Sequence, residues 1–186
     1  MSELAKLNNF ILGVDGVYQA GSEQRPFNYS DGESSEKKLF QILSICDDLS
    51  SASTELEDKI VDWPTEYHLS SARSNLLRPL NFEGVTRVLE LGCGCGSISR
   101  FLGEQEGVEV DAIEGSPIRA GLASLRCRDL PNVSISTANF NDIEFPENYY
   151  DLVLFIGVTE YAGRFSERET DQEALADLLN LGKRAA

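Results

Sequence analysis

The sequence is poor in basic residues and has no long apolar segment. Its 186 residues contain 16 Lys and Arg against 31 Asp and Glu, which gives a formal net charge of −15. Such a charge argues against a partner held by its phosphate backbone, although it does not exclude small cationic ligands. No apolar run approaches the roughly 20 residues of a membrane span, and residues 1–6 lack the pattern of a signal peptide. We therefore expect a cytoplasmic protein with no membrane span and no nucleic-acid partner.

Metal ligands are scarce as well. The only histidine is His68, and the cysteines Cys46, Cys93, Cys95 and Cys127 form neither a C-x-x-C pair nor a Cys/His spacing typical of a metal site. We therefore expect reduced cytoplasmic thiols and no bound metal.

The N-terminal third of the chain is predicted to be a mostly helical extension covering residues 1–62. A hydrophobic share of 41% excludes wholesale disorder. Apolar residues recur at helical spacing over 33–49, and a second helix follows over 54–61. The stretch 10–14 has the length of a short strand.

Residues 63–186 have a different pattern, in which strands and helices alternate. A bend at Trp63-Pro64 precedes a predicted helix over 65–80. Strands are then predicted at 87–91, 108–113, 132–137 and 151–156, and helices at 97–105, 117–128 and 171–181. This alternation predicts an α/β fold, a doubly wound parallel sheet with helices on both faces.

The fourth predicted strand is apolar along its whole length, as expected for the interior of a sheet. Residues 157–186 nevertheless leave room for only one helix and a tail. A buried type of strand at an exposed edge is normally avoided. We therefore expect a sheet truncated after the fourth strand, with its edge covered by the remainder of a longer chain or by a second copy in a homodimer.

A glycine-rich loop follows the first of these strands and opens a helix. It reads Glu90-Leu91-Gly92-Cys93-Gly94-Cys95-Gly96. Glycines in such a loop let the backbone approach a ligand closely. The dinucleotide fingerprint G-x-G-x-x-G requires a Gly or Ala where this chain has Ser97.

Two carboxylates near this loop indicate the kind of ligand that it binds. Glu90 would repel a pyrophosphate and suits an ammonium group, although it would also serve as a cap for the loop amides. Glu114 ends the second strand, where a carboxylate can accept both hydroxyls of a ribose, the alternative being a solvated residue at a strand end. A cationic tail, a free ribose and no phosphate describe S-adenosylmethionine, and they do not describe NAD.

These residues resemble a class I S-adenosylmethionine-dependent methyltransferase, with a Rossmann-like fold. The resemblance covers about 63–165 and includes the loop Glu90–Gly96 and the segments 111–117, 138–143 and 150–161. Members of that family have a seven-stranded sheet, of which this chain would supply the first four strands.

The resemblance implies a set of cofactor-binding residues. Asn139 stands where the family usually has an acid that contacts the adenine amino group, and an amide oxygen can accept the same hydrogen bond. The backbone amide of Phe140 would meet the adenine edge, and Ile156 and Gly157 would touch the methionine part. The full expected cofactor set is Glu90, Gly92, Cys93, Gly94, Gly96, Glu114, Gly115, Asn139, Phe140, Ile156, Gly157, Tyr67 and Arg73.

Methyl transfer depends mostly on positioning, and a hydroxyl acceptor also needs a base. The candidates are His68, Glu160 and Tyr161, with Tyr67 as a further one; His68 is the only side chain with an ordinary pKa near neutrality. Tyr67 would close over the cofactor and Arg73 would pair with its carboxylate. The alternatives are a packing or surface histidine, a core tyrosine, and a solvated or salt-bridged arginine.

Residues 63–80 also resemble the lead-in helix of methyltransferase modules attached to bacterial glycosyltransferases, which implies acceptors in polysaccharide synthesis. The predicted function is S-adenosylmethionine-dependent methyl transfer to a small-molecule or saccharide acceptor. The alternative is a truncated or non-catalytic cofactor-binding or interaction module of the same fold. Ser97 and Glu90 disfavour a nicotinamide oxidoreductase.

Overall fold

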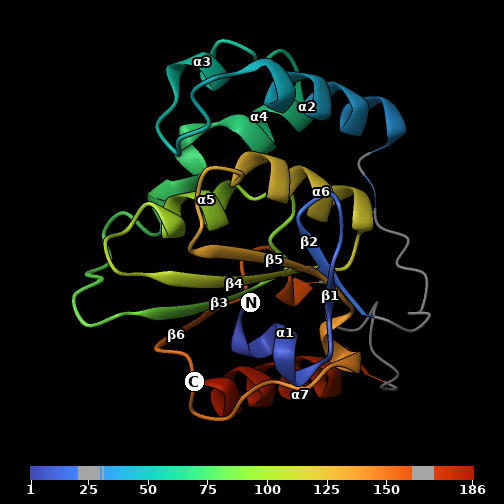
Figure 1. Ribbon diagram of the computed structural model, residues 1–186, viewed down its shortest axis with the longest axis vertical. Coiled ribbons are helices and arrows are strands. Elements are labelled where there is room, and N and C mark those ends of the chain that lie inside the picture. Colours follow the sequence, from blue (N-terminus) through green and yellow to red (C-terminus); the bar gives the residue numbers. More distant parts are fainter. Residues whose placement is uncertain (21–29, 31, 161–169) are drawn as a thin grey trace.

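The computed structural model describes residues 1–20, 30, 32–160 and 170–186, and its centre is a six-stranded sheet (Figure 1). The strand order is β1-β2-β5-β4-β3-β6. The strands are β1 (Ile11–Leu12), β2 (Val17–Gln19), β3 (Arg87–Leu91), β4 (Glu109–Glu114), β5 (Val133–Thr137) and β6 (Leu152–Leu154). The last four are the strands predicted for residues 63–186.

All neighbouring strands from β2 to β6 are parallel, and only β1 is antiparallel to its neighbour. In the register of β3 and β4, Glu90 lies opposite Ala112, so Glu114 follows two residues further along the same face. Both acids therefore lie at the carboxyl edge of the sheet, on the side covered by α5 (Ser97–Gly103) and α6 (Pro117–Arg126).

Helices cover both faces of the sheet (Figure 1). On one face, α5 (Ser97–Gly103) and α6 (Pro117–Arg126) pack against inward side chains such as Val88 and Ala112. On the other face, α1 (Glu3–Leu7) and α7 (Asp171–Ala185) form a core with Leu89, Leu91 and Ile113. Successive strand residues point to opposite faces, so these two cores show the expected doubly wound α/β arrangement.

A further helical layer lies over α5 and α6. It consists of α2 (Glu33–Ile45), α3 (Thr54–Glu57), α4 (Trp63–Leu69) and the 3₁₀ helix η1 (Ser71–Leu76), at the top of Figure 1. Its buried leucines pack with Cys95 of the glycine loop and Leu122 of α6. This packing joins the N-terminal helices to the part of the sheet that carries the glycine loop.

The N-terminal segment is not only helical, because it supplies two strands. β1 falls within the stretch predicted to be a short strand, and the turn 13–16 connects it to β2. β2 pairs in parallel with β5, which lies more than a hundred residues further along the chain. The expected boundary between 1–62 and 63–186 remains a prediction, but residues 17–19 are part of the sheet.

The single helix predicted over 65–80 is wrong. α4 begins at Trp63 because Asp62 caps it: the Asp62 side chain accepts from the Thr65 amide, and the Thr65 hydroxyl accepts from the Asp62 amide. Pro64 is tolerated in this first turn. The helix ends at Leu69, because the backbone of the next residue, Ser70, is extended (φ −61°, ψ 133°), and η1 follows it.

β6 is the last strand in the order of the sheet, and α7 packs beside it. α7 continues to Ala185, beyond the predicted end at residue 181. In the described ranges, none of the helices combines the length and the apolar character needed to cross a bilayer.

Candidate functional site

The glycine loop between β3 and α5 turns sharply around the end of β4. Gly92, Gly94 and Gly96 all have positive φ angles, of 78°, 57° and 78°. The amides of Gly92 and Cys93 both donate to the carbonyl of Ile113, at 2.8 and 3.0 Å. A Cβ on Gly92 would lie 2.4 Å from Cγ2 of Val158. This position therefore requires glycine, both for its φ angle and for the close approach of the loop after β6.

Glu90 is buried directly beneath this loop, with 3% of its surface exposed. The hydroxyl of Ser99 in α5 donates to its Oε2 at 2.6 Å. Desolvation raises the pKa of Glu90 to about 7, with a further increase from Glu114, while Ser99 and Arg73 act in the opposite direction. Among the described residues, Glu90 does not cap the loop amides, and its partner is the Ser99 hydroxyl of the following helix.

Glu114 is also buried, with 5% exposure, so it is not a solvated residue at a strand end. Its Oε2 accepts from the Gly94 amide at 2.8 Å and its Oε1 accepts from the Ser116 amide at 2.9 Å. Burial raises its pKa, and Arg119 and the backbone amides oppose that shift. The carboxylate is thus held against the glycine loop, and each oxygen keeps further lone pairs for a ligand hydroxyl.

Helix α4 and the start of η1 form one wall above the loop. Trp63 and Tyr67 stack with ring centroids 5.2 Å apart, and the His68 ring meets Tyr67 edge-on at 5.0 Å. Arg73 lies 4.1 Å from the centroid of the Tyr67 ring, and its Nη2 donates to the Tyr67 hydroxyl at 3.3 Å. A Cβ on Gly94 would lie 4.0 Å from Cε1 of His68, so the buried imidazole faces the glycine loop.

The opposite wall comes from the segments after β5 and β6. Asn139 begins the 3₁₀ helix η2 (Phe140–Asp142), and its Oδ1 accepts from the Asn141 amide at 3.1 Å. Gly157 has a φ of 70°, and a Cβ there would lie 3.3 Å from the Tyr67 hydroxyl and 3.9 Å from Oε1 of Glu160. The loop after β6 therefore faces α4 across the site.

These walls enclose a cavity of about 230 Å³ at the carboxyl edge of the sheet. Of the predicted residues, it is lined by Tyr67, His68, Arg73, Glu90, Gly92, Cys93, Gly94, Glu114, Gly115, Asn139, Phe140, Ile156, Gly157 and Glu160. Residues from five separate segments of the sequence thus converge on one site.

One predicted residue is placed differently. Gly96 does not line the cavity: its Cβ would lie 2.8 Å from Cα of Ala123, so this glycine allows α5 to approach α6 closely. Tyr161 lies outside the described residues. The structure gives Gly96 a packing role, and its role as a cofactor contact stays a prediction.

The cavity also contains residues that the sequence analysis did not assign. Trp63, Cys95, Ser97, Ile98, Arg119, Ala138 and Val158 belong to its lining. Arg119 is the one with the clearest electrostatic effect, since its charge opposes the rise that burial causes in the pKa of Glu114. Arg119 is the third residue of α6, which directly follows the segment that carries Glu114. This position in the sequence could have indicated that it lies at the site.

A parallel sheet with a glycine loop and two acids at the ends of adjacent strands defines an α/β domain that binds a nucleoside-type ligand at this edge. The methyltransferase domain family matches residues 88–180, which is half of the chain. The chain belongs to this family, as the resemblance to S-adenosylmethionine-dependent methyltransferases implied.

Individual relatives match shorter parts of the chain. The ubiquinone/menaquinone biosynthesis C-methyltransferase UbiE of Yersinia enterocolitica is 39% identical over 72 residues, covering 36% of this chain and 29% of that protein. An S-adenosylmethionine-dependent methyltransferase from Aquifex aeolicus is 23% identical, with a TM-score of 0.46 over 72% of this chain and 66% of the other. Phosphoethanolamine N-methyltransferase 1 of Haemonchus contortus is 18% identical, with a TM-score of 0.41 over 65% and 24%.

The residues of the cavity fit S-adenosylmethionine. The loop leaves room above Gly94, where a Cβ would meet only Cε1 of His68 at 4.0 Å, and the two buried carboxylates suit an ammonium group and a ribose. Because Glu90 and Glu114 are acidic and deeply buried, the same residues do not suit a pyrophosphate.

Proposed function

We propose that this chain binds S-adenosylmethionine in the cavity and takes part in methyl transfer to a small-molecule or saccharide acceptor. The single observation that carries the proposal is the pair of buried acids, Glu90 and Glu114, in one cavity with the glycine loop. Since the chain spans less than a third of its curated relative, the activity of the whole protein is part of the proposal.

Each end of the cofactor has a matching group in this proposal. Glu90 accepts from the ammonium group, and Glu114 accepts from the ribose hydroxyls while it keeps its bonds to Gly94 and Ser116. Asn139 faces the adenine amino group with the amide oxygen that already accepts from Asn141. Arg73 lines the cavity and provides a cation for the carboxylate.

When bound, S-adenosylmethionine supplies an electrophilic methyl group on a positively charged sulfur. The protein's contribution is to align the acceptor and exclude water. Trp63 and Tyr67 form an aromatic wall that keeps water out, and Gly157 allows the loop after β6 to approach that wall. The two charged acids hold the ligand in one orientation.

A hydroxyl acceptor needs a group that takes up its proton. We propose His68 for this step, because its imidazole is buried in the wall above the glycine loop and histidine is the side chain most often used as a general base. Glu160 lines the same cavity and is the second candidate. Tyr161 remains a prediction from the sequence.

Calorimetric titration with S-adenosylmethionine, S-adenosylhomocysteine and NAD tests the proposal. We expect the wild type to bind S-adenosylmethionine and S-adenosylhomocysteine and not to bind NAD. Glu114→Gln keeps the shape and loses the charge, and we expect at least a roughly tenfold weaker complex, since hydrogen bonds to charged groups contribute about 1.5–3 kcal/mol. Binding of NAD alone would contradict the proposal.

A further inference from the structure

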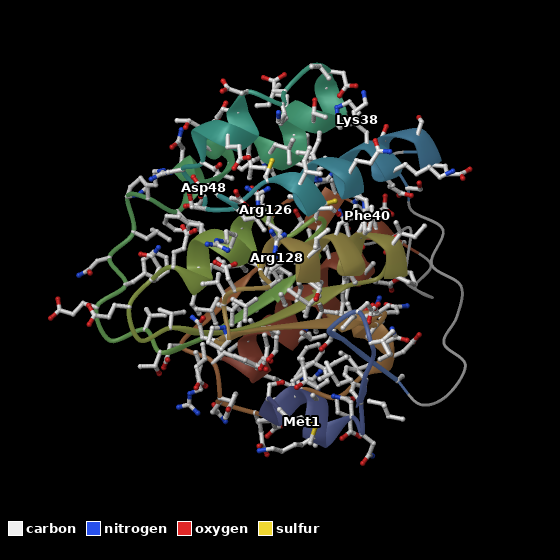
Figure 2. The ribbon with its side chains drawn as sticks, turned by 45° about the horizontal axis from the view of Figure 1, so that its top comes forward. Met1, Lys38, Phe40, Asp48, Arg126 and Arg128 are labelled. Atoms are coloured by element: carbon white, nitrogen blue, oxygen red, sulfur yellow. The ribbon has the colours of Figure 1, made fainter. Side chains whose placement is uncertain are left out.

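Two arginines connect the upper helical layer to helix α6 (Figure 2). Arg126 is the last residue of α6, and its Nη1 donates to the carbonyl oxygen of His68 in the last turn of α4. Arg128 donates to the carbonyls of Leu43 and Cys46, at 2.8 and 3.0 Å, where α2 ends. Each guanidinium thus binds the C-terminal end of a helix, where carbonyls lack partners and the dipole favours a cation.

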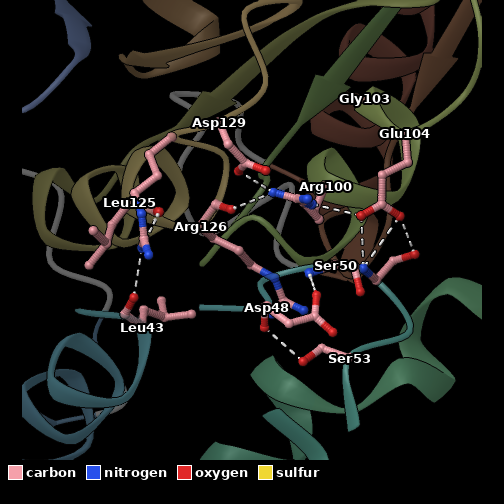
Figure 3. Close-up of polar contacts among 12 residues, drawn as sticks. Leu43, Asp48, Ser50, Ser53, Arg100, Gly103, Glu104, Leu125, Arg126 and Asp129 are labelled. Carbon is pink, nitrogen blue, oxygen red and sulfur yellow. Dashed lines mark hydrogen bonds and ion pairs between the residues drawn. The ribbon is translucent and has the colours of Figure 1, made fainter. Parts of the chain in front are cut away.

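The backbone around Arg126 is itself held in place (Figure 3). Nη1 of Arg100 donates to the carbonyl oxygen of Arg126 at 3.2 Å, and Arg100 also pairs with Glu104 and Asp129. Glu104 in turn accepts from the amide and the hydroxyl of Ser51 in the upper layer. The end of α6 is therefore a fixed point from which the Arg126 side chain reaches α4.

Arg126 is placed where a charge is costly. It is 1% exposed, and its Nε has no hydrogen-bond partner among the described residues. Within those residues it forms no ion pair with a carboxylate, and desolvation lowers its pKa to about 10, so it stays protonated at neutral pH. An apolar side chain would fill this space without the cost of a buried charge. What the guanidinium adds is its bond to the His68 carbonyl.

That carbonyl belongs to a residue of the cavity wall. The His68 imidazole faces Gly94, and its neighbour Tyr67 reaches Gly157 on the opposite side. α4 has only seven residues, so a displacement of its last turn moves both rings. The bond from Arg126 therefore holds the last turn of α4, and with it the rings of Tyr67 and His68, in position above the glycine loop.

We propose that Arg126 is a positioning residue of the cofactor site, which fixes the end of α4 so that Tyr67 and His68 close over the glycine loop. The inference rests on the proposed function for its ligand, S-adenosylhomocysteine. Arg128 is the matched control, because it holds α2, which contributes no residue to the lining of the cavity.

The first test is calorimetry with S-adenosylhomocysteine on wild type, Arg126→Met, Arg126→Lys and Arg128→Met, with urea unfolding of each variant. We expect the Kd of Arg126→Met to rise roughly tenfold, which corresponds to about 1.4 kcal/mol. Arg126→Lys, which keeps one donor, recovers part of the affinity. Arg128→Met loses stability but keeps its Kd within about twofold, as expected for a site that does not touch the wall.

The second test is a pair of double-mutant cycles, which separates positioning from general loss of stability. If Arg126 acts through α4, its effect on the Kd shrinks once Tyr67→Ala has removed the wall, and it adds fully to that of Asn139→Ala on the opposite side. Should Arg126→Met fail to fold, the same cycles are measured with Arg126→Lys. Additivity with Tyr67→Ala, or an unchanged Kd in a folded Arg126→Met, would overturn the inference while leaving wild-type binding intact.

The third test needs no ligand. Trp63 is the only tryptophan and the first residue of α4, so its fluorescence reports the position of this helix. We expect acrylamide quenching of Trp63 to change in Arg126→Met and to stay as in wild type in Arg128→Met. Equal quenching in all three proteins would refute the positioning role. Failure of the wild type to bind S-adenosylhomocysteine in the calorimetry would instead refute the proposed function.

Discussion

The acid beneath the glycine loop makes the stability of the free protein depend on pH. The ordinary pKa of a glutamate is 4.5, and burial raises that of Glu90 to about 7. Between these values the unfolded chain releases a proton that the folded protein keeps, so the free energy of unfolding falls as the pH rises. A difference of about 2.5 pKa units corresponds to about 3 kcal/mol, which is lost by pH 8.

Glu90→Gln removes this titration while keeping the shape of the side chain and an oxygen that accepts from Ser99. We expect the variant to gain stability over the wild type as the pH rises, with the difference between them growing by about 3 kcal/mol from pH 4.5 to pH 8. Urea unfolding followed at several pH values measures this difference directly, because all other titrating groups are common to both proteins.

Binding of the ligand should favour the ionised form of Glu90, whereas folding favours the protonated form. An ammonium group beside Glu90 favours the ionised carboxylate, so S-adenosylhomocysteine should displace a proton from wild-type protein near pH 7. Calorimetry in buffers of different ionisation enthalpy detects that proton. The reasoning is refuted if the stability curves of wild type and Glu90→Gln run parallel from pH 4.5 to pH 8, because Glu90 would then titrate as an exposed residue.

Three further substitutions test the glycine positions and a buried hydrogen bond. Gly92→Ala should lower the free energy of unfolding by about 2–4 kcal/mol in urea, since it adds a clash with Val158 to the cost of a positive φ; Gly107→Ala, with a φ of 74° and open space, should lose only about 1–2 kcal/mol. Tyr150→Phe should cost about 1–3 kcal/mol, and the cost should grow as the pH rises and Asp111 ionises, because the Tyr150 hydroxyl donates to Oδ2 of this buried carboxylate. Equal losses for both glycines, or a pH-independent loss for Tyr150→Phe, would contradict these contacts.

Much of the sheet could be predicted from the sequence because its strands are apolar runs separated by helices. β3 to β6 lie within a residue or two of the predicted positions. β1 and β2 have only two and three residues, and β2 depends on β5, a partner far along the chain. Such a pairing is set by tertiary packing and leaves no periodic pattern in the sequence.

The parts of the site that depend on the course of the backbone, namely the glycine loop and the strand ends, could be predicted from the sequence. The glycines and the strand-end acids Glu90 and Glu114 are fixed by the order of elements, so their spacing alone brings them together. Trp63 and Arg119 reach the cavity through the docking of α4 and α6, which depends on side chains such as Arg126. The division of 65–80 into two helices depends on the extended backbone of Ser70, whose hydroxyl caps η1 by accepting from the Ala72 amide.

The most direct test of this account is a crystal structure of the chain soaked with S-adenosylhomocysteine. We predict the ligand in the cavity, with its amino-acid end beside Glu90 and its ribose on Glu114. A cavity that stays empty at saturating ligand, or a ligand whose ribose lies away from Glu114, would contradict it.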